Sequence, residues 1–151
     1  MAVSVAAVLR RAGLTPSIVR RGTEGEPAFL FEDGTAVATL YEPPHGSPHP
    51  LWGVAAALAH ADDDLVLVVP CDLPDLTADA VRALVDVGGP AVAWDGDRLH
   101  PLLGVYPRSR AAEATRTAAS GGSVHGFVAD VPRVWVDPAA MRNVNRPEDQ
   151  G

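Results

Sequence analysis

Apolar and polar positions along this chain predict helices and strands that follow one another in turn. The spacing of Val5, Val8 and Leu9 predicts a helix over 2–12, which Gly13 would end. The run 65–69 is apolar at every position, which is typical of a strand covered on both faces in a parallel sheet. The other predicted helices are 51–60, 77–86, 109–119 and 123–128, and the other predicted strands are 17–20, 91–94, 102–106 and 133–136.

Between the first two predicted helices the pattern indicates a hairpin and then a loop. The apolar runs 28–31 and 36–40 flank Glu32-Asp33-Gly34, and Asp-Gly between strand-like runs favours a hairpin. Four prolines make 42–50 a loop. The whole pattern predicts an α/β fold with a mainly parallel sheet, and 151 residues are enough for a single domain over 1–151.

The charge balance narrows the classes of function. All 12 basic residues are Arg, and 19 acidic residues give a formal net charge of -7. Such a balance argues against binding nucleic acid or an anionic membrane through bulk charge. The absence of Lys also excludes lysine chemistry, such as a Schiff base or a lysine that clamps phosphate.

The single cysteine and the N-terminal pattern bear on location. With Cys71 alone, the chain forms no internal disulfide, which favours a reducing, cytoplasmic setting. The apolar N-terminus precedes Arg10-Arg11, whereas a signal peptide carries its charges before the apolar run. We therefore expect a cytoplasmic protein with no membrane segment.

One carboxylate follows the most apolar strand. Asp72 comes directly after 65–69, and ligands of open α/β sheets lie beyond the carboxyl ends of strands. A carboxylate there suits Mg²⁺, which takes one or two protein carboxylates and leaves its other positions to phosphate and water. The alternative is that Asp72 only caps the turn before Pro74.

Four segments, in order, resemble motifs of the molybdenum cofactor guanylyltransferase family, whose members are MobA-like nucleotidyltransferases. They cover the chain from the second predicted helix to the tail. The segments are His49-Pro50-Leu51-Trp52-Gly53-Val54, Leu65-Val66-Leu67-Val68-Val69-Pro70-Cys71-Asp72-Leu73-Pro74, His100-Pro101-Leu102-Leu103-Gly104-Val105-Tyr106 and Asn143-Val144-Asn145-Arg146-Pro147-Glu148-Asp149.

The resemblance implies a three-layer α/β/α, Rossmann-like nucleotidyltransferase that uses Mg²⁺. Its substrates would be GTP and the molybdenum (molybdopterin) cofactor, whose terminal phosphate attacks the α-phosphorus and releases pyrophosphate. Catalysis of this kind is mostly positioning and charge neutralisation. The resemblance also admits partner proteins, namely molybdoenzymes or other proteins of cofactor biosynthesis.

The resemblance also assigns roles to individual residues. Asp72 would be the catalytic metal ligand. On the nucleotide side it places Glu42, Leu51, Gly53 and Pro70, with Asp72. On the acceptor side it places His100, Asn143 and Asn145.

Each role has a structural alternative, and two residues depart from the family pattern. A carboxylate reads guanine by accepting from its N1–H and N2–H₂, but Glu42 is one methylene longer than the family's Asp and is equally a solvated loop residue. Trp52 replaces a small residue in the nucleotide loop. His100 replaces a Gln and is alternatively only structural. Asn143 and Asn145 are alternatively turn formers before Pro147.

The family's first signature, a Gly-rich loop after a first strand followed by a Lys, has no match here. Residues 2–13 resemble the helix after that loop, so a central strand and a phosphate loop are missing, and the chain is expected to be N-terminally truncated. Three explanations remain open: a start codon set too late, a non-catalytic relative, or repacking of 28–40 into the gap. Loss of a central strand would leave the backbone of its two neighbours unpaired.

Two other functions remain open. One is a nucleotidyltransferase that acts on a different phosphorylated acceptor. The other is a binding or partner-interaction module that has the same fold and has lost catalysis.

Overall fold

The computed structural model describes residues 1–21 and 27–142 of the chain. The helices are α1 (Ala2–Arg11), α2 (Leu51–Ala59), α3 (Ala78–Val85), α4 (Ala111–Ser120) and α5 (Val124–Phe127). The strands are β1 (Ser17–Arg20), β2 (Ala38–Tyr41), β3 (Leu65–Val68), β4 (Ala91–Trp94), β5 (Leu99–Pro107) and β6 (Arg133–Trp135). Short 3-10 helices follow β5 and β6, at Arg108–Arg110 and Pro138–Met141.

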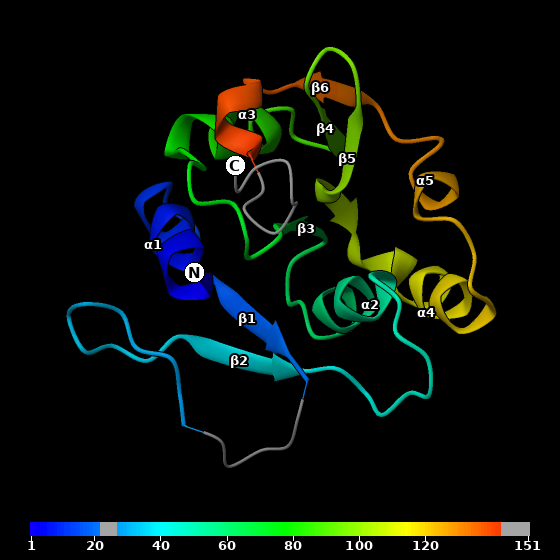
Figure 1. Ribbon diagram of the computed structural model, residues 1–151, viewed down its shortest axis with the longest axis horizontal. Helices are drawn as coiled ribbons and strands as arrows, with labels where there is room; N and C mark the ends of the chain where they lie inside the picture. The colour runs from blue at the N-terminus through cyan, green and yellow to red at the C-terminus, as the bar shows by residue number, and fades with distance from the viewer. Residues whose placement is uncertain (22–26, 143–151) are drawn as a thin grey trace, which may run out of the picture.

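The strands form two sheets with mixed pairing. β1 and β2 form a parallel pair, and the larger sheet has the order β3-β5-β4-β6. Within the larger sheet, β5 is antiparallel to both β3 and β4, whereas β4 and β6 are parallel. The α/β class is therefore confirmed (Figure 1). The parallel pairs are β1-β2 and β4-β6, and the antiparallel pairs are the two that β5 makes.

Two clusters of buried side chains cover the two faces of the sheet and give the three layers. Along β3, Leu67 packs into the cluster that also contains residues of α1 and α3. Its neighbours Val66 and Val68 pack into the other cluster, with residues of α2, α4 and α5. The alternation follows from the period of two along a strand, and Figure 1 shows these two groups of helices on different sides of β3 and β5.

Most elements form where the sequence predicts them, and two segments differ from the prediction. The predicted helix 77–86 forms as α3, and Thr77 caps it by accepting a hydrogen bond from the N–H of Ala80 at 3.1 Å. The expected hairpin is reduced to one antiparallel bridge between Leu30 and Ala36. The run 65–69 becomes β3, which is an antiparallel edge strand and only half-buried, because one of its edges lies along a cavity and not along another strand.

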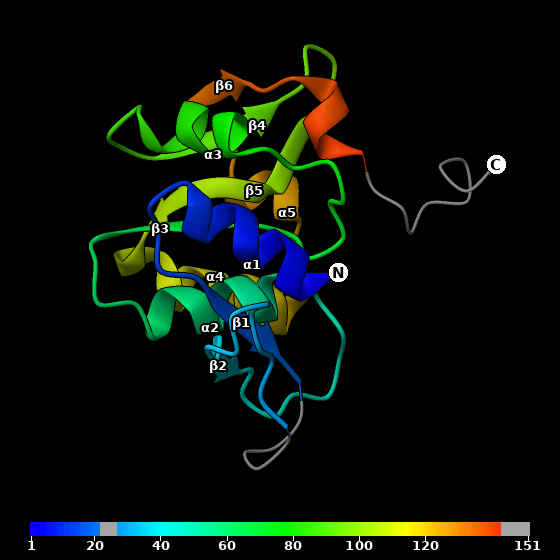
Figure 2. The same ribbon diagram turned by 90° about the vertical axis from the view of Figure 1, so that its left-hand side faces the viewer.

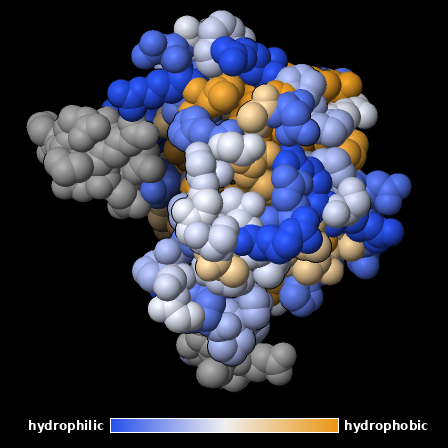
Figure 3. Space-filling view, turned by 90° about the vertical axis from the view of Figure 1, so that its right-hand side faces the viewer, coloured by the Kyte–Doolittle hydropathy of each residue, from blue (hydrophilic) through white to orange (hydrophobic). Residues whose placement is uncertain are grey.

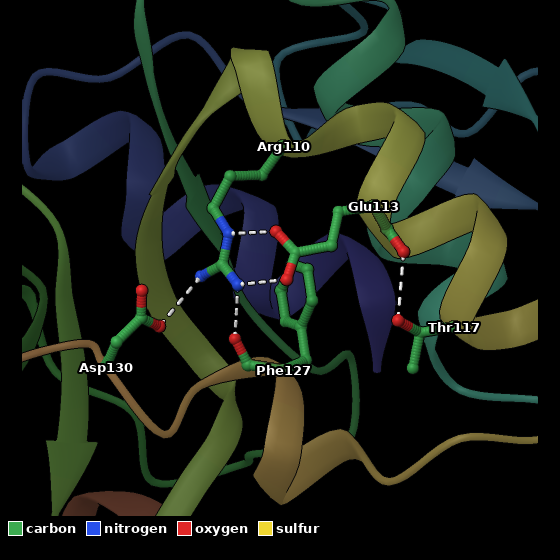
Figure 4. A network of polar contacts seen from close by, with 5 residues as sticks. All are labelled: Arg110, Glu113, Thr117, Phe127 and Asp130. Carbon is green, nitrogen blue, oxygen red and sulfur yellow. Dashed lines mark hydrogen bonds and ion pairs between the residues drawn. The ribbon is translucent and has the colours of Figure 1, made fainter.

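Arg110, where β5 leads into α4, joins three parts of the chain (Figure 4). Its guanidinium donates two hydrogen bonds to Glu113, at 2.8 and 2.9 Å, and one to the carbonyl of Phe127 at 2.5 Å. It also lies 4.0 Å from the centre of the Phe127 ring and 3.8 Å from Asp130. The hydrogen bonds to Glu113 raise the pKa of Arg110 and lower that of Glu113. This network fixes α5 against the end of β5.

The face that carries α4 and α5 has no uniform character. Figure 3 shows apolar residues concentrated in its upper part and hydrophilic residues around them. Within residues 1–21 and 27–142, no helix has the length and apolar content needed to cross a membrane.

Candidate functional site

The segment after β3 lies between two cavities. Pro70 lines both of them, and so does Leu102 of β5. Glu42 and Gly53 line the larger cavity, whereas Asp72 and His100 line the smaller one. The structure therefore places Glu42 and Gly53 in a different cavity from His100, with the β3 end between them. Asp72, which the sequence also assigns to the nucleotide side, lies with His100 in the smaller cavity, and Leu51 lines neither cavity.

The larger cavity, about 830 Å³, lies where the two sheets are separated. Its walls include every residue of β1 and β3, together with residues of α1 and α2. Figure 2 shows α1 lying across the region between β1 and β3. Among the described strands, none pairs with the edges of β1 and β3 that line this cavity.

The separation of β1 from β3 decides whether residues 28–40 fill the gap, which the sequence left open. The segment after the bridge at Leu30 and Ala36 continues into β2, which pairs with β1 in parallel register from Ser17 opposite Ala38 to Arg20 opposite Tyr41. The cavity between β1 and β3 stays open. Repacking of 28–40 into the gap is therefore the wrong explanation, because that segment pairs with β1 and does not bridge it to β3.

Glu42 lines the larger cavity and contacts two neighbouring side chains. Its side chain is 12% exposed, and its Oε2 accepts a hydrogen bond from Nε of Arg21 at 3.2 Å. The same oxygen lies 3.6 Å from Nε2 of His45. A Cβ at Gly53 would be 3.5 Å from Oε1 of Glu42, an ordinary contact, so Gly53 and the carboxylate are direct neighbours. A base that reached Glu42 would compete with Arg21.

Leu51 and Trp52 begin α2 and are buried in the hydrophobic core. Leu51 is 1% exposed, and its N–H donates to Nδ1 of His49 at 3.1 Å. Trp52 is 9% exposed, donates from Nε1 to the carbonyl of Ser47 at 2.9 Å and stacks on His45 with 4.7 Å between ring centroids. The bulk of Trp52 therefore packs against the proline-rich loop and leaves the larger cavity open.

The smaller cavity, about 660 Å³, contains the candidate metal ligand. Asp72 is half-buried and shares the lining with a second carboxylate, Asp97 of the β4–β5 turn. Over the described ranges, no group of three or more metal-ligating side chains gathers. One or two carboxylates fit Mg²⁺ that is completed by phosphate oxygens and water, and they do not fit an all-protein cage.

The His100–Tyr106 motif has a structural explanation. Pairing between β4 and β5 shifts at this point, from Val92 opposite Gly104 to Ala93 opposite His100, which makes a bulge. The hydroxyl of Tyr106 donates a hydrogen bond to the carbonyl of Pro101 and so stabilises the bulge. A Cβ at Gly104 would lie 2.7 Å from that hydroxyl and 2.8 Å from the carbonyl oxygen of Ala91, so only glycine fits. Bulges of this kind redirect side chains beside active sites, and here the bulge presents His100 to the cavity.

Four residues around this cavity were not predicted from the sequence. Asp95 accepts a hydrogen bond from Nε2 of His100 at 2.9 Å, and Arg98, His125 and Arg133 share the lining with His100. In the segment Asp95-Gly96-Asp97, the turn-forming tendency of the first Asp was the available signal for Asp95. The other three come from separate elements that only the fold brings together. Asn143 and Asn145 lie outside the described residues.

The comparisons with known proteins point to one family. The family model of the MobA-like NTP transferase domain matches residues 1–134. A molybdenum cofactor guanylyltransferase of Serratia proteamaculans is 40% identical over 117 residues, which are 76% of this chain and 58% of that protein. One of Photobacterium profundum is 31% identical over 68% of this chain and 57% of its own length. The chain thus spans less than two thirds of these relatives.

Solved structures show the same fold. Molybdopterin-guanine dinucleotide biosynthesis protein A of Archaeoglobus fulgidus has a TM-score of 0.59 at 20% identity, over 75% of this chain and 64% of that one. A protein of Aquifex aeolicus VF5 has a TM-score of 0.61 at 22% identity, over 73% and 63%. Both support the Rossmann-like, three-layer arrangement.

Proposed function

The chain belongs to the MobA-like NTP transferase domain family, and we propose that it contributes to the transfer of GMP from GTP to the molybdopterin cofactor. The observation that carries this proposal is the position of the β3 end. It separates a cavity lined by Glu42 and Gly53 from one lined by Asp72 and His100. Two substrates that bind on either side of this segment would bring their phosphates together beside Asp72.

The reaction needs in-line geometry and charge neutralisation. An oxygen of the acceptor's terminal phosphate forms a bond to the α-phosphorus of GTP, and the bond from that phosphorus to the bridging oxygen breaks, which releases pyrophosphate. Asp72 would hold Mg²⁺, and bound Mg²⁺ would neutralise charge on the phosphate oxygens. Glu42 would face the base, and Gly53 would let the backbone approach the nucleotide closely. Pro70 and the backbone at Leu51 would shape the nucleotide side.

Nucleotide affinity is expected to be low in residues 1–151 alone. The sequence has no Lys, and no segment of it matches the Gly-rich phosphate loop of the guanylyltransferase family that it resembles. Isothermal titration of this chain with GTP and Mg²⁺ is therefore expected to show weak binding. A micromolar dissociation constant would contradict this expectation.

The experiment that tests the function is a pyrophosphate-release assay. The chain is incubated with Mg²⁺, the molybdopterin cofactor and each nucleoside triphosphate in turn, and GTP is expected to be preferred. Asp72→Asn is expected to abolish release, whereas Asp79→Asn, a change of equal charge at a side chain 95% exposed on α3, is expected to leave it unchanged. Release that is equal in Asp72→Asn would refute the proposed role of Asp72.

The same assay separates the alternatives. Pyrophosphate release only with another phosphorylated acceptor would assign a different nucleotidyltransferase. No release under any condition, with unchanged binding in Asp72→Asn, would assign a binding module. A cytoplasmic location and partner proteins of cofactor biosynthesis stay predictions.

A further inference from the structure

Two side chains contact the same carboxylate oxygen of Glu42, which opens the loop from β2 to α2 (Figure 1). Nε of Arg21 donates a hydrogen bond to Oε2 at 3.2 Å, and the Arg21 side chain is 62% exposed. Nε2 of His45 lies 3.6 Å from the same oxygen, and the His45 side chain is 9% exposed. An exposed ion pair is weak and exchanges with water. The carboxylate thus has one exchangeable neighbour and one buried neighbour.

The imidazole of His45 is fixed by the chain around it. The two prolines at 43–44 connect it to Glu42, and their rings hold the backbone angle φ, which restricts the distance between the two residues. The ring stacks on Trp52 with 4.7 Å between centroids and 7° between planes. Nε1 of Trp52 donates a hydrogen bond to the carbonyl of Ser47 at 2.9 Å, so the stacking partner is also held in place.

Packing alone does not explain a histidine at this position. Nδ1 of His45 is shielded from solvent and has no hydrogen-bond partner among the described residues. A buried polar atom without a partner lowers stability, whereas a phenylalanine ring would stack on Trp52 without that cost. The polar contact that the structure shows for this ring is the one from Nε2 to Glu42. The identity of the residue is therefore explained by the carboxylate and not by the stack.

We propose that His45, supported by Trp52, is a positioning residue that orients the carboxylate of Glu42 toward the guanine base. The inference rests on the proposed function, which places Glu42 against the base. His45 lines neither the larger nor the smaller cavity, so it acts through Glu42 and not by direct contact with the nucleotide. An N–H group at Nε2, or an imidazolium, attracts Oε2 and limits the rotation of the glutamate side chain.

The two contacts on Oε2 then have different roles. A base that arrives at the carboxylate displaces the exposed Arg21, while the buried His45 stays and keeps Oε1 on the side of Gly53. Glu42 has one methylene more than an aspartate, so an additional torsion must be fixed before its oxygens can accept from N1–H and N2–H₂ of guanine. Fixing that torsion in advance lowers the entropy cost of reading the base. His45 is therefore expected to set the preference for guanine over hypoxanthine, which lacks the N2 amino group.

The test compares this preference in two variants of His45. The full chain is titrated with GMP and, separately, with IMP by ¹H–¹⁵N NMR, which detects weak binding, and the ratio of the two dissociation constants is taken. Both nucleotides carry the same phosphate, so the ratio reports the contact to the base. His45→Phe keeps the stack on Trp52 and removes Nε2. His45→Gln loses the stack and keeps an N–H donor for Glu42.

A positioning role and a packing role predict opposite patterns for these variants. We expect the native protein to prefer GMP by about tenfold, as for one hydrogen bond, and His45→Phe to lower that preference roughly three- to fivefold. The urea midpoint of His45→Phe is expected to equal or exceed the native value, because the unpaired Nδ1 is gone. His45→Gln is expected to be less stable than His45→Phe and to keep more of the preference.

Two further variants are the controls. Glu42→Gln is expected to abolish the preference, and His45→Phe is expected to have no further effect on the ratio in a Glu42→Gln background, because it acts through that carboxylate. Arg21→Gln removes the other contact on Oε2 and is expected to keep or raise the ratio.

A native ratio in His45→Phe would overturn the positioning role, and so would an equal effect of His45→Phe in the Glu42→Gln background. If His45→Phe does not fold, His45→Gln decides, since a ratio as low as that of Glu42→Gln would overturn the role. A native ratio near one, an absence of shifts with both nucleotides, or an unchanged ratio in Glu42→Gln would overturn the inference together with the proposed role of Glu42. A GMP preference that depends on His45, with no pyrophosphate release, would support the inference and refute the proposed function.

Discussion

Replacement of Gly104 by alanine tests whether the bulge in β5 requires a residue without a side chain. Gly104 pairs with Val68 of β3 and with Val92 of β4, so its backbone is fixed from both sides. An added Cβ would lie 2.8 Å from the carbonyl oxygen of Ala91, which belongs to the neighbouring strand, and 2.7 Å from the hydroxyl of Tyr106. Either β4 and β5 separate or the Tyr106 ring moves and its hydrogen bond to Pro101 is lost.

The magnitude follows from these contacts. Overpacking at a fixed backbone costs about 2 kcal/mol, and loss of the Tyr106 hydrogen bond costs about 1.5 kcal/mol. The lower entropy of alanine in the unfolded chain returns about 0.7 kcal/mol. We therefore expect the free energy of unfolding to fall by about 3 kcal/mol, which lowers Tm by roughly 8 °C for a chain of this size.

Urea titration and calorimetry measure this loss, and Gly46→Ala is the matched control. Gly46 has no atom within 4 Å of an added Cβ, and the same substitution there is expected to change stability by less than about 1 kcal/mol. A Gly104→Ala protein as stable as the Gly46→Ala protein would refute the account of the bulge. So would a loss of stability with no effect on the NMR signals of His100, since the bulge is argued to present that ring.

Three further predictions concern the surroundings of the site. Arg110→Ala removes the hydrogen bonds to Glu113 and Phe127 (Figure 4) and is expected to lower the free energy of unfolding in urea by about 2 kcal/mol. The NMR signals of α5 are expected to broaden. A variant as stable as the native protein would show that these contacts do not stabilise the fold. Trp52→Ala removes the stack on His45 and is expected to cost about 3 to 5 kcal/mol, and Trp52→Phe clearly less, as measured by thermal unfolding; equal costs would contradict a role for ring packing. Because the pKa of Asp95 is lowered from 3.8 to about 2, its stabilising contribution is complete above about pH 4 and is lost as the pH falls toward 2. Urea midpoints followed from pH 5 to 2 should therefore fall less steeply in Asp95→Asn than in the native protein, and parallel curves would contradict the shift.

Local sequence signals predicted the elements, whereas the pairing of strands was not predicted. The caps and breakers, such as Thr77 before α3 and Gly121 after α4, act over one helical turn, so they can be read from neighbouring residues. The apolar run 65–69 shows what a local signal cannot predict, namely the neighbours of a strand. An apolar strand looks the same whether a parallel neighbour, an antiparallel neighbour or a cavity lies beside it, and β3 has β5 on one edge and a cavity on the other.

For the candidate site, the sequence by itself determined the family and the strand-end position of Asp72, because motifs and their order are properties of the chain. The tertiary structure decided three things: that β1 and β3 border an open cavity, that Trp52 packs into the core, and that Asp95 holds His100 among Arg98, His125 and Arg133. These depend on segments up to tens of residues apart whose distances are set only when the sheet and its helices pack, so no local pattern contains them.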